Sequence, residues 1–308
     1  MRYTLRQLEI FVGVARAGSI SRAAELLSMS QSAASSGLAE LERQFDVQLF
    51  DRVGKSVRLN ELGERLLPRA VEFLDRGEDI EALLRGHIGY GTLDIGATLT
   101  IGNYLATLIV AEFLQRHADS RVRLEVHNTA TIIQQVGNFE LDLGLVEGRC
   151  RHPDLEVVPW LEDELVVFCA PTHPLAGRAE ATPEDLADQQ WILREIGSGT
   201  RETFDQATCH LEGRLHVRLE LEHTEAIKRA VESGLGIGCI SRMALREAFR
   251  RGSLVPVETP WLDLRRRFHF LWHRLKFQTA GMQAFLELCR EMTAGAIRSD
   301  EIELSYIR

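Results

Sequence analysis

The sequence has no long apolar run. A membrane-spanning helix needs about 20 consecutive apolar residues, but the most apolar stretch, residues 101–114, is interrupted by Asn103 and Glu112. The first residues, MRYTLRQLEIF, also lack the apolar core and small-residue cleavage site of a secretory signal. With 45% hydrophobic and 26% charged residues, the composition is that of a globular protein. We therefore expect a folded cytoplasmic protein with no membrane partner.

Cysteine is scarce and widely spaced. The five cysteines lie 19 to 50 residues apart without any Cys-x-x-Cys pair, which argues against a zinc site or a thioredoxin-like motif. The chain also has no Gly-x-Ser-x-Gly elbow, and its glycines at 234–238 do not form a Gly-x-Gly-x-x-Gly pattern. These absences predict that the protein is not an enzyme and holds no metal or cofactor. Redox sensing by Cys150 or Cys209 is an alternative.

Charge is divided unevenly along the chain, whose net charge is −9. Residues 1–60 contain eight Lys and Arg against six Asp and Glu, a net charge of +2, so the remainder carries −11. A basic head can bind nucleic acid although the whole protein is acidic, because attraction to phosphate is a local effect. The charge pattern permits DNA binding without requiring it.

The first sixty residues predict three short helices and a hairpin. Apolar residues recur at helical spacing over 5–17, Gly18 follows, and Ser19 or Ser21 is placed to cap a second helix. After a short turn, a third helix is expected over 31–45. The residues that these two helices should bury are Ala23, Ala24, Leu26 and Leu27, then Ala34, Leu38, Leu41 and Phe45. Such a tight turn between helices is typical of a helix-turn-helix, with residues 49–60 as a wing.

The polar face of the third helix carries side chains that can read base edges. Glutamine can pair bidentately with adenine, and serine can bond to several bases. The alternative is the solvated face of an ordinary helical bundle. The residues that we expect at DNA are Ser21 and Arg22 of the second helix, Gln31, Ser32, Ser35 and Ser36 of the third, and Arg52, Lys55 and Arg58 at phosphates beside the hairpin.

Four segments of this head resemble the N-terminal domain of LysR-type transcriptional regulators in residue type, order and spacing. They are LRQLEIF at 5–11, GSISRAA at 18–24, SQSAAS at 30–35 and LERQFDVQLFDR at 41–52. The resemblance implies a winged helix-turn-helix and a ligand-responsive regulator of promoter DNA. Two departures stand out: Ser32 replaces a common proline, and Ser36 with Gly37 replaces a larger polar or basic residue. Base readout by an arginine is therefore not available there.

Residues 61–88 predict one long helix with an apolar stripe. The stripe, spaced at three or four residues apart from a gap at Gly77, comprises Leu62, Leu66, Ala70, Phe73, Ile80 and Leu84. The small head alone cannot bury it, so we expect a partner helix; the alternative is packing onto the chain's own C-terminal domain. In the resembled family this segment is the linker helix of a homodimer, and the resemblance implies a homotetramer on DNA.

Strands and helices alternate after the boundary at 89–91, which predicts an α/β fold with crossover helices. The expected strands are 92–97, 121–127, 141–146, 165–169, 191–194, 216–221, 236–240 and 264–272, and the expected helices are 101–115, 131–138, 200–211, 224–233 and 279–292. Two lobes linked by crossing strands resemble the family's regulatory domain, which has type II periplasmic-binding-protein architecture. The expected parts are a DNA-binding domain at 1–60, a linker at 61–88 and an effector-binding domain at 89–308, with lobe I at about 89–161 and 267–308 and lobe II at about 162–266.

Two loops, one in each lobe, follow a strand and begin a helix. Free backbone N–H groups, hydroxyls and the positive end of the helix dipole suit a small anion there. The alternative is that Ser and Thr only cap the helices. The expected effector-binding residues are Thr98 and Thr100, then Ser198, Gly199, Thr200 and Arg201, with Thr129, Glu147 and Thr224 in support. Glu147 would either pair with Arg149 or accept a hydrogen from a protonated ligand.

Three segments look most like the sulfur-assimilation branch of the family: GNFELDLGLVEG at 137–148, REIGSGTR at 194–201 and HTEA at 223–226. The resemblance implies sulfite or another small sulfur compound as effector. The alternatives are a LysR-type regulator of another pathway, such as redox stress, and a solute-binding protein or enzyme for a small anion. A solute-binding protein predicts a signal peptide and no helix-turn-helix, and an enzyme predicts a catalytic pair or a metal cluster; the sequence meets neither expectation.

Overall fold

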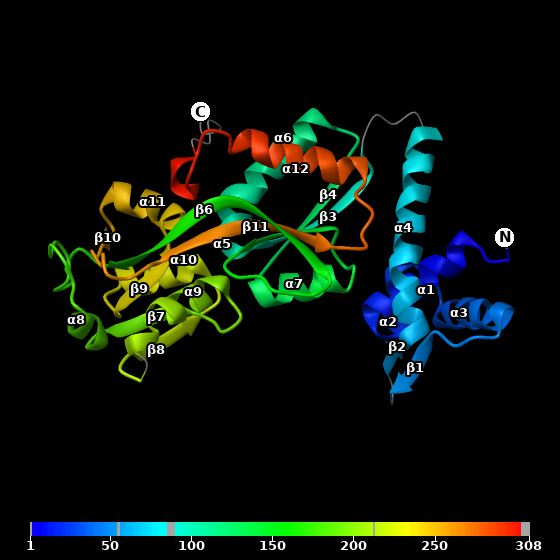
Figure 1. The fold of residues 1–308 in the computed structure, drawn as a ribbon, viewed down its shortest axis with the longest axis horizontal. Coiled ribbons are helices and arrows are strands. Elements are labelled where there is room, and N and C mark those ends of the chain that lie inside the picture. The colour runs from blue at the N-terminus through cyan, green and yellow to red at the C-terminus, as the bar shows by residue number, and fades with distance from the viewer. Residues whose placement is uncertain (1, 54–55, 85–89, 212, 303–308) are drawn as a thin grey trace.

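The computed structural model describes residues 2–53, 56–84, 90–211 and 213–302. A helical head is followed by one long helix, and the remaining residues form a mixed α/β domain (Figure 1). Within these ranges, none of the helices combines the length and the apolar character that crossing a membrane requires.

The head is a helix-turn-helix with a small wing. It contains α1 (Leu5–Ala17), α2 (Ile20–Leu26), α3 (Gln31–Phe45) and the antiparallel strands β1 (Phe50–Val53) and β2 (Ser56–Leu59). Thr4 begins α1 with a capping box to Gln7, and Gly18 ends that helix in the left-handed region at φ 61°. The Val57 N–H donates to the Gly18 carbonyl at 3.2 Å and so ties the wing to the turn after α1. The expected winged helix-turn-helix is confirmed.

Two side chains expected in the head's core are exposed instead. Leu26 is 74% exposed and Phe45 is 46% exposed. Leu26 lies in the last turn of a seven-residue helix whose inner face is formed by Ala23 and Ala24. Phe45 ends α3 and meets the ring of Tyr3, with 6.3 Å between the centroids. The prediction was wrong for these two residues because both lie at helix ends, where the apolar stripe turns out of the core.

The long helix α4 (Glu61–Leu84) has two different sides. Its first half is buried in the apolar cluster of the head through Leu67, Ala70 and Val71. Its second half contacts the C-terminal domain through an ion pair and a cation–π contact. The members of the expected stripe that are exposed are Leu62, Phe73, Ile80 and Leu84. The helix therefore packs on its own chain along one side and presents an uncovered apolar stripe on another.

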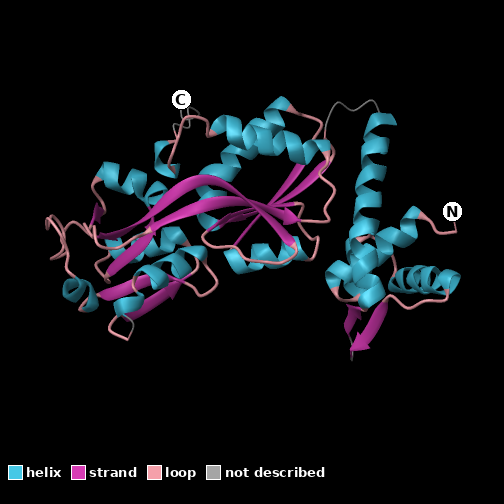
Figure 2. Cartoon of the chain, viewed as in Figure 1, coloured by secondary structure: helices cyan, strands magenta, loops and turns pink. Residues whose placement is uncertain are grey.

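The C-terminal domain is built on a nine-stranded sheet in the order β4-β3-β5-β11-β6-β9-β7-β8, with β10 paired to β6. The strands are β3 (Thr92–Thr98), β4 (Arg121–His127), β5 (Leu143–Glu147), β6 (Leu155–Cys169), β7 (Gln190–Arg194), β8 (His216–Leu221), β9 (Ile237–Ser241), β10 (Val255–Pro256) and β11 (Arg265–His273). β3 is parallel to β4 and β5, and β7 is parallel to β8 and β9. The antiparallel strands β6 and β11 join these two sets, which confirms the two-lobed α/β architecture (Figure 2).

Helices cover the faces of both strand sets (Figure 2). They are α5 (Leu99–Ile101), the π-helical turn η1 (Gly102–Ala106), α6 (Thr107–Arg116), α7 (Thr129–Gly137), α8 (Pro183–Ala187), α9 (Gly199–Ala207), α10 (Thr224–Glu232), α11 (Arg242–Arg251) and α12 (Ala280–Met292), with 3₁₀ turns η2 (Cys209–Leu211) and η3 (Ser299–Glu301). Four buried apolar clusters lie between these helices and the sheet. Each lobe thus has its own core on both faces of the sheet.

The strand β6 is ten residues longer at its start than the expected 165–169. Residues 155–164 pair with β11, and residues 165–168 pair with β9, so this one strand passes from lobe I to lobe II. The helix α11, the short α8 and the short β10 are likewise absent from the sequence prediction. Charged residues interrupt the first part of β6 and occupy half of α11, which obscures the apolar periodicity of both elements.

Candidate DNA-binding face and effector site

The residues expected to read bases stand together on the outer face of α3. All four are exposed: Gln31, Ser32, Ser35 and Ser36. Ser30 caps the helix by accepting the N–H of Ala33 at 3.2 Å, and its hydroxyl lies 3.0 Å from that of Ser32. A Cβ on Gly37 would lie 2.5 Å from Ile10 Cδ1. Glycine at this position therefore lets α3 approach α1 closely.

The remaining DNA candidates lie on α2 and the wing. Ser21 and Arg22 are exposed in the first turn of α2, and Arg58 is exposed on β2. Arg52 belongs to β1, although its side chain is not described, and Lys55 lies outside the described residues. The exposed face thus combines an amide, hydroxyls and guanidiniums, which are the groups that bind base edges and phosphate oxygens.

Most of the expected effector residues meet where the two lobes touch. All of them except Arg201 are buried: Thr98, Thr100, Thr129, Glu147, Ser198, Gly199, Thr200 and Thr224. The Gly199 N–H donates to Thr129 Oγ1 at 3.0 Å, and the Ala130 N–H donates to the Gly197 carbonyl at 3.1 Å. A Cβ on Gly199 would lie 2.2 Å from the Glu147 carbonyl oxygen. The absence of a side chain at this position is what allows lobe II to reach lobe I so closely.

Arg266, on the crossing strand β11, connects the two expected loops. Its side chain is 2% exposed. Nη1 donates to Thr200 Oγ1 in lobe II at 2.9 Å, and Nη2 donates to Thr100 Oγ1 in lobe I at 3.4 Å. Nε donates to Asp163 Oδ2, on the other crossing strand, at 2.6 Å. One guanidinium therefore contacts the helix N-termini of both lobes, and the sequence prediction missed this residue.

Glu147, at the end of β5, is buried beside Arg266. Its Oε1 lies 3.7 Å from Arg266 Nη1, and its Oε2 accepts the hydroxyl of Thr98. Burial raises the pKa of the Glu147 carboxyl, and the positive charges of Arg266 and Arg194 offset only part of that rise. The structure places Glu147 beside Arg266 rather than Arg149, which removes the first of the two alternatives for this residue.

Arg194 supplies a second buried cation that sequence reasoning missed. It ends β7, and its Nε and Nη2 donate to Glu195 at 2.7 and 2.9 Å. Its side chain is 1% exposed, and Nη1 has no hydrogen-bond partner among the described residues. A buried donor without a partner costs free energy. The positive charge of Arg194 counteracts part of the burial-induced rise in the pKa of Glu147. The unpaired Arg194 Nη1 therefore belongs to the same electrostatic environment as Glu147.

Arg201 reaches this group through the backbone of Arg194, whose carbonyl accepts its Nη1 at 3.1 Å, and Thr224 lies on a separate helix. Arg201 Nε donates to Asp205 at 2.9 Å and Nη1 donates to Glu220 at 2.8 Å, so its guanidinium is already paired within lobe II. Thr224 is buried in the first turn of α10. Its neighbour Glu225 accepts the hydroxyl of Tyr104, from lobe I, which is a separate contact between the lobes.

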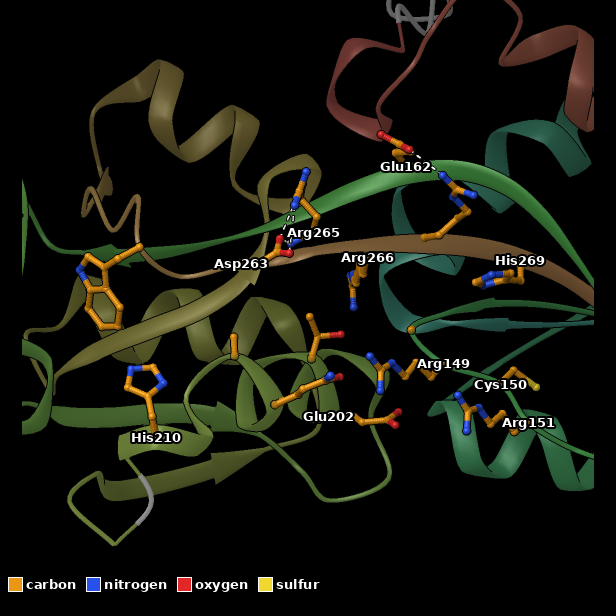
Figure 3. Close-up of a pocket in the computed structure, with 16 residues that line it drawn as sticks. Arg149, Cys150, Arg151, Glu162, Glu202, His210, Asp263, Arg265, Arg266 and His269 are labelled. Carbon is orange, nitrogen blue, oxygen red and sulfur yellow. Dashed lines mark hydrogen bonds and ion pairs between the residues drawn. The ribbon is translucent and has the colours of Figure 1, made fainter. Parts of the chain in front are cut away.

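Two cavities adjoin the buried groups. The larger has a volume of about 900 Å³ and lies along the edge of β11, between the loop at 148–151 and α9 (Figure 3). Five arginines line it: Arg149, Arg151, Arg265, Arg266 and Arg267. The smaller, of about 370 Å³, is lined by Thr129, Ser198 and Arg201 among others. Arg266 therefore lines the larger cavity, and three of the expected effector residues, Thr129, Ser198 and Arg201, line the smaller, so both lie beside open space of a size that admits small ions.

The cysteines give no support to the redox alternative. Burial raises the pKa of the Cys150 thiol to about 11, and Glu202 adds to the rise. That thiol is therefore protonated at neutral pH, which makes it a poor nucleophile. Cys209 is exposed and forms no disulfide. Throughout the part of the chain that the structure describes, His, Cys, Asp and Glu side chains form no group that could hold a metal ion.

Two family models match the chain. Residues 5–64 match the bacterial regulatory helix-turn-helix protein, lysR family, and residues 89–294 match the LysR substrate binding domain. Among curated proteins, the uncharacterized HTH-type transcriptional regulator YeiE of Escherichia coli (strain K12) is 43% identical over 289 residues. The alignment covers 94% of this chain and 98% of YeiE.

Solved structures agree with these matches. The regulatory domain of CcmR from Synechocystis PCC6803, in complex with 2-PG, is 31% identical with a TM-score of 0.62, covering 67% of this chain and 98% of that one. A full-length OxyR variant from Pseudomonas aeruginosa is 22% identical and shares the fold, with a TM-score of 0.71 and coverage of 94% and 95%. The matched families are regulators and not enzymes. The chain therefore belongs to the LysR family of DNA-binding transcriptional regulators.

Proposed function

We propose that this regulator binds promoter DNA through the outer face of α3 and the wing, and that binding responds to a small oxyanion, with sulfite as the first candidate. The oxyanion would bind at the Arg266 cluster, defined as Thr98, Thr100, Thr129, Glu147, Asp163, Arg194, Ser198, Gly199, Thr200 and Arg266. The observation that carries this proposal is the Arg266 guanidinium, which reaches hydroxyls at the helix N-termini of both lobes. An ion at this point would touch both lobes and so favour one arrangement of them.

The chemistry of the cluster suits a compact oxyanion. Hydroxyls, backbone N–H groups of α5 and α9, and two guanidiniums stand within a small buried region. The Arg194 Nη1 offers a donor that has no partner among the described residues. A large aromatic ligand would need an apolar pocket, which these groups do not form. The likeness of segments 137–148, 194–201 and 223–226 to the sulfur-assimilation branch favours sulfite over other oxyanions.

The charge of the cluster sets a condition on the ligand. Two guanidiniums, those of Arg194 and Arg266, lie beside three carboxylates. The carboxylates belong to Glu147, Asp163 and Glu195, so the net charge of the five groups is −1 when all are ionised. An added anion therefore requires a proton, on the ligand or on the protein, to avoid repulsion between buried like charges. Glu147 is the group whose raised pKa favours taking that proton.

Titration calorimetry on the full-length chain tests the effector. The ligands are sulfite, sulfate, thiosulfate, O-acetylserine and 2-PG. We expect sulfite to bind, and Thr100→Ala and Ser198→Ala each to weaken it about five-fold, since each removes roughly 1 kcal/mol of hydrogen bonding. Thr92→Ala is the matched control, because Thr92 is exposed at the far end of the strand that leads to Thr98. If both cleft variants bind sulfite as tightly as the parent, the anion site lies elsewhere.

We also propose an oligomeric state, a functional division of the chain and a cellular location. The uncovered stripe of α4 supports a homodimer paired through that helix, with two dimers on promoter DNA. The functional division would then be 1–60 for DNA binding, 61–88 for pairing and 89–308 for the effector. A protein that acts on promoter DNA would work in the cytoplasm. Sequencing the DNA recovered with the protein from cells tests this setting and supplies the operator for the experiments.

A further inference from the structure

A second buried ion cluster lies where α4 meets lobe I, at the other end of the lobe from Arg266. Lys276 is 8% exposed, and its Nζ lies 2.6 Å from Asp75 Oδ2 and 2.7 Å from Asp142 Oδ1. Asp75 belongs to α4, whereas Lys276 and Asp142 belong to lobe I. We name this contact the dock, defined as Asp75, Phe139, Asp142, His273 and Lys276. It holds the linker helix against the effector-binding domain.

Phe139 gives the dock an apolar anchor. Its side chain is 4% exposed within the same apolar cluster as Leu67 and Val71 of α4. Its ring centroid lies 4.1 Å from that of His273. The backbone of Phe139 has a φ of 59°, in the left-handed region that bulky residues rarely occupy. A bulky residue stays in such a conformation only where its surroundings fix it. For Phe139, the packing against the head and α4 does so.

Two paired strands run from the dock to the Arg266 cluster. Asp142 directly precedes β5, and Glu147 ends that strand. β11 contains Arg266 near its start and leads at its other end to Lys276. The two strands are antiparallel neighbours over residues 268–271. The nine-residue β11 spans about 26 Å at 3.3 Å per residue. Each ion cluster thus contains one acidic and one basic residue that lie in this pair of strands or just beyond their ends.

We propose that β5 and β11 couple the two clusters, so that filling the effector site changes how firmly lobe I holds the linker helix. A ligand that binds Glu147 and Arg266 would shift both strands, and the residues that flank their other ends, Asp142 and Lys276, form the ion cluster with Asp75. The coupling is reciprocal, because any change at one site that biases the strands biases the other. This inference rests on the proposed function for the identity of the effector, but the strand connection itself is a property of the chain.

Hydrogen exchange on the full-length chain tests the connection without any ligand. Glu147→Gln changes the effector end of β5 while keeping the side chain's shape. We expect the amides of α4 at residues 72–77 to exchange at least three-fold faster in this variant. Glu195→Gln is the control, since it removes a carboxylate bonded to Arg194 on lobe II, directly after β7, a strand that pairs with neither β5 nor β11. Unchanged exchange at 72–77 in Glu147→Gln would overturn the coupling.

Operator binding with and without sulfite gives a second readout. Asp75→Asn removes the ion pair between α4 and Lys276. We expect that sulfite then changes the operator Kd of this variant by less than two-fold. Glu64→Gln, on an exposed position of the same helix, removes the same charge and should keep the parent's ratio of the Kd values with and without sulfite. A parent-like ratio in Asp75→Asn contradicts the proposal. If the parent binds no sulfite but Glu147→Gln still speeds exchange at 72–77, the coupling stands and the proposed effector fails.

Discussion

At the residue scale, we expect different residues of the head to read bases and to bind phosphates. Gln31 is exposed in the first turn of α3, where its amide can form a bidentate pair with adenine. We expect Gln31→Ala to weaken binding to the operator by ~1–3 kcal/mol while leaving binding to random DNA nearly unchanged. Fluorescence anisotropy with both DNAs measures this difference. Equal losses on the two DNAs would show that Gln31 does not read bases.

Arg58, exposed on the wing, should behave differently. Arg58→Ala removes a charge suited to a phosphate, so we expect affinity to fall on every sequence alike. The slope of log Kd against log salt should decrease by about one, since one fewer counterion is released. A salt titration on operator and random DNA measures both effects. A loss confined to the operator would assign Arg58 to base contact.

We expect Glu147 to make effector binding depend on pH. Burial raises the pKa of its carboxyl, so the protonated fraction grows as pH falls toward that raised value. Because an anion binds best when Glu147 is neutral, we expect its affinity to rise as pH falls, by up to about ten-fold per pH unit above the pKa. Glu147→Gln removes this dependence, and the ligand's own titration is common to both proteins. Calorimetry between pH 6 and 8 compares them; parallel pH profiles would exclude Glu147 as the proton acceptor.

Sequence reasoning named the hydroxyls of the proposed effector site but not its two buried cations, Arg194 and Arg266. Thr98, Thr100 and Thr200 are recognisable because they stand between a strand and a helix. Arg266 sits in a run of three arginines that resembles a solvated strand, and its partner Asp163 is 103 residues away. Only the pairing of β6 with β11 brings these two together. Local patterns predict local caps, whereas a buried ion pair between distant strands depends on topology.

At the element scale, the uncovered side of α4 predicts a partner helix. Ile80 is 58% exposed and Leu84 is 81% exposed, although both are large and apolar. We expect Ile80→Glu with Leu84→Glu to dissociate the paired helices, because pairing would bury two uncompensated charges. Leu275→Glu, which alters an exposed leucine outside α4, is the control. Light scattering gives the mass of each variant, and an unchanged oligomer would place the interface elsewhere.

Most elements of the fold are readable from periodicity, and the exceptions have a common cause. β4 and β8 match their expected limits because alternating residues mark both ends. The first part of β6 and the helix α11 carry many charged residues, so their apolar faces are too narrow to recognise alone. These elements are stabilised by neighbours that are distant in the sequence, and one of them, β6, forms the connection between the lobes.

At the scale of the whole molecule, the order of domains follows from the sequence but their contact does not. The head, the long helix and the alternating domain each have a distinct pattern. Lys276 and Asp75, which join the helix to lobe I, are 201 residues apart, and neither stands out within its own segment. The chain's patterns therefore define the parts, while complementary buried charges define how the parts meet.

The close approach at Gly199 has a consequence for genetics. A single methyl group there would lie 2.2 Å from the Glu147 carbonyl oxygen, and this steric clash would force the two lobes apart. We expect Gly199→Ala to lock transcription of the target gene at one level, whether or not sulfite is supplied to the cells. Gly137→Ala, whose methyl group would meet only the ring of His152 at 3.8 Å, should respond like the parent in the same reporter strain. A selection for alleles whose transcription no longer responds to sulfite should therefore return substitutions of Gly199 repeatedly.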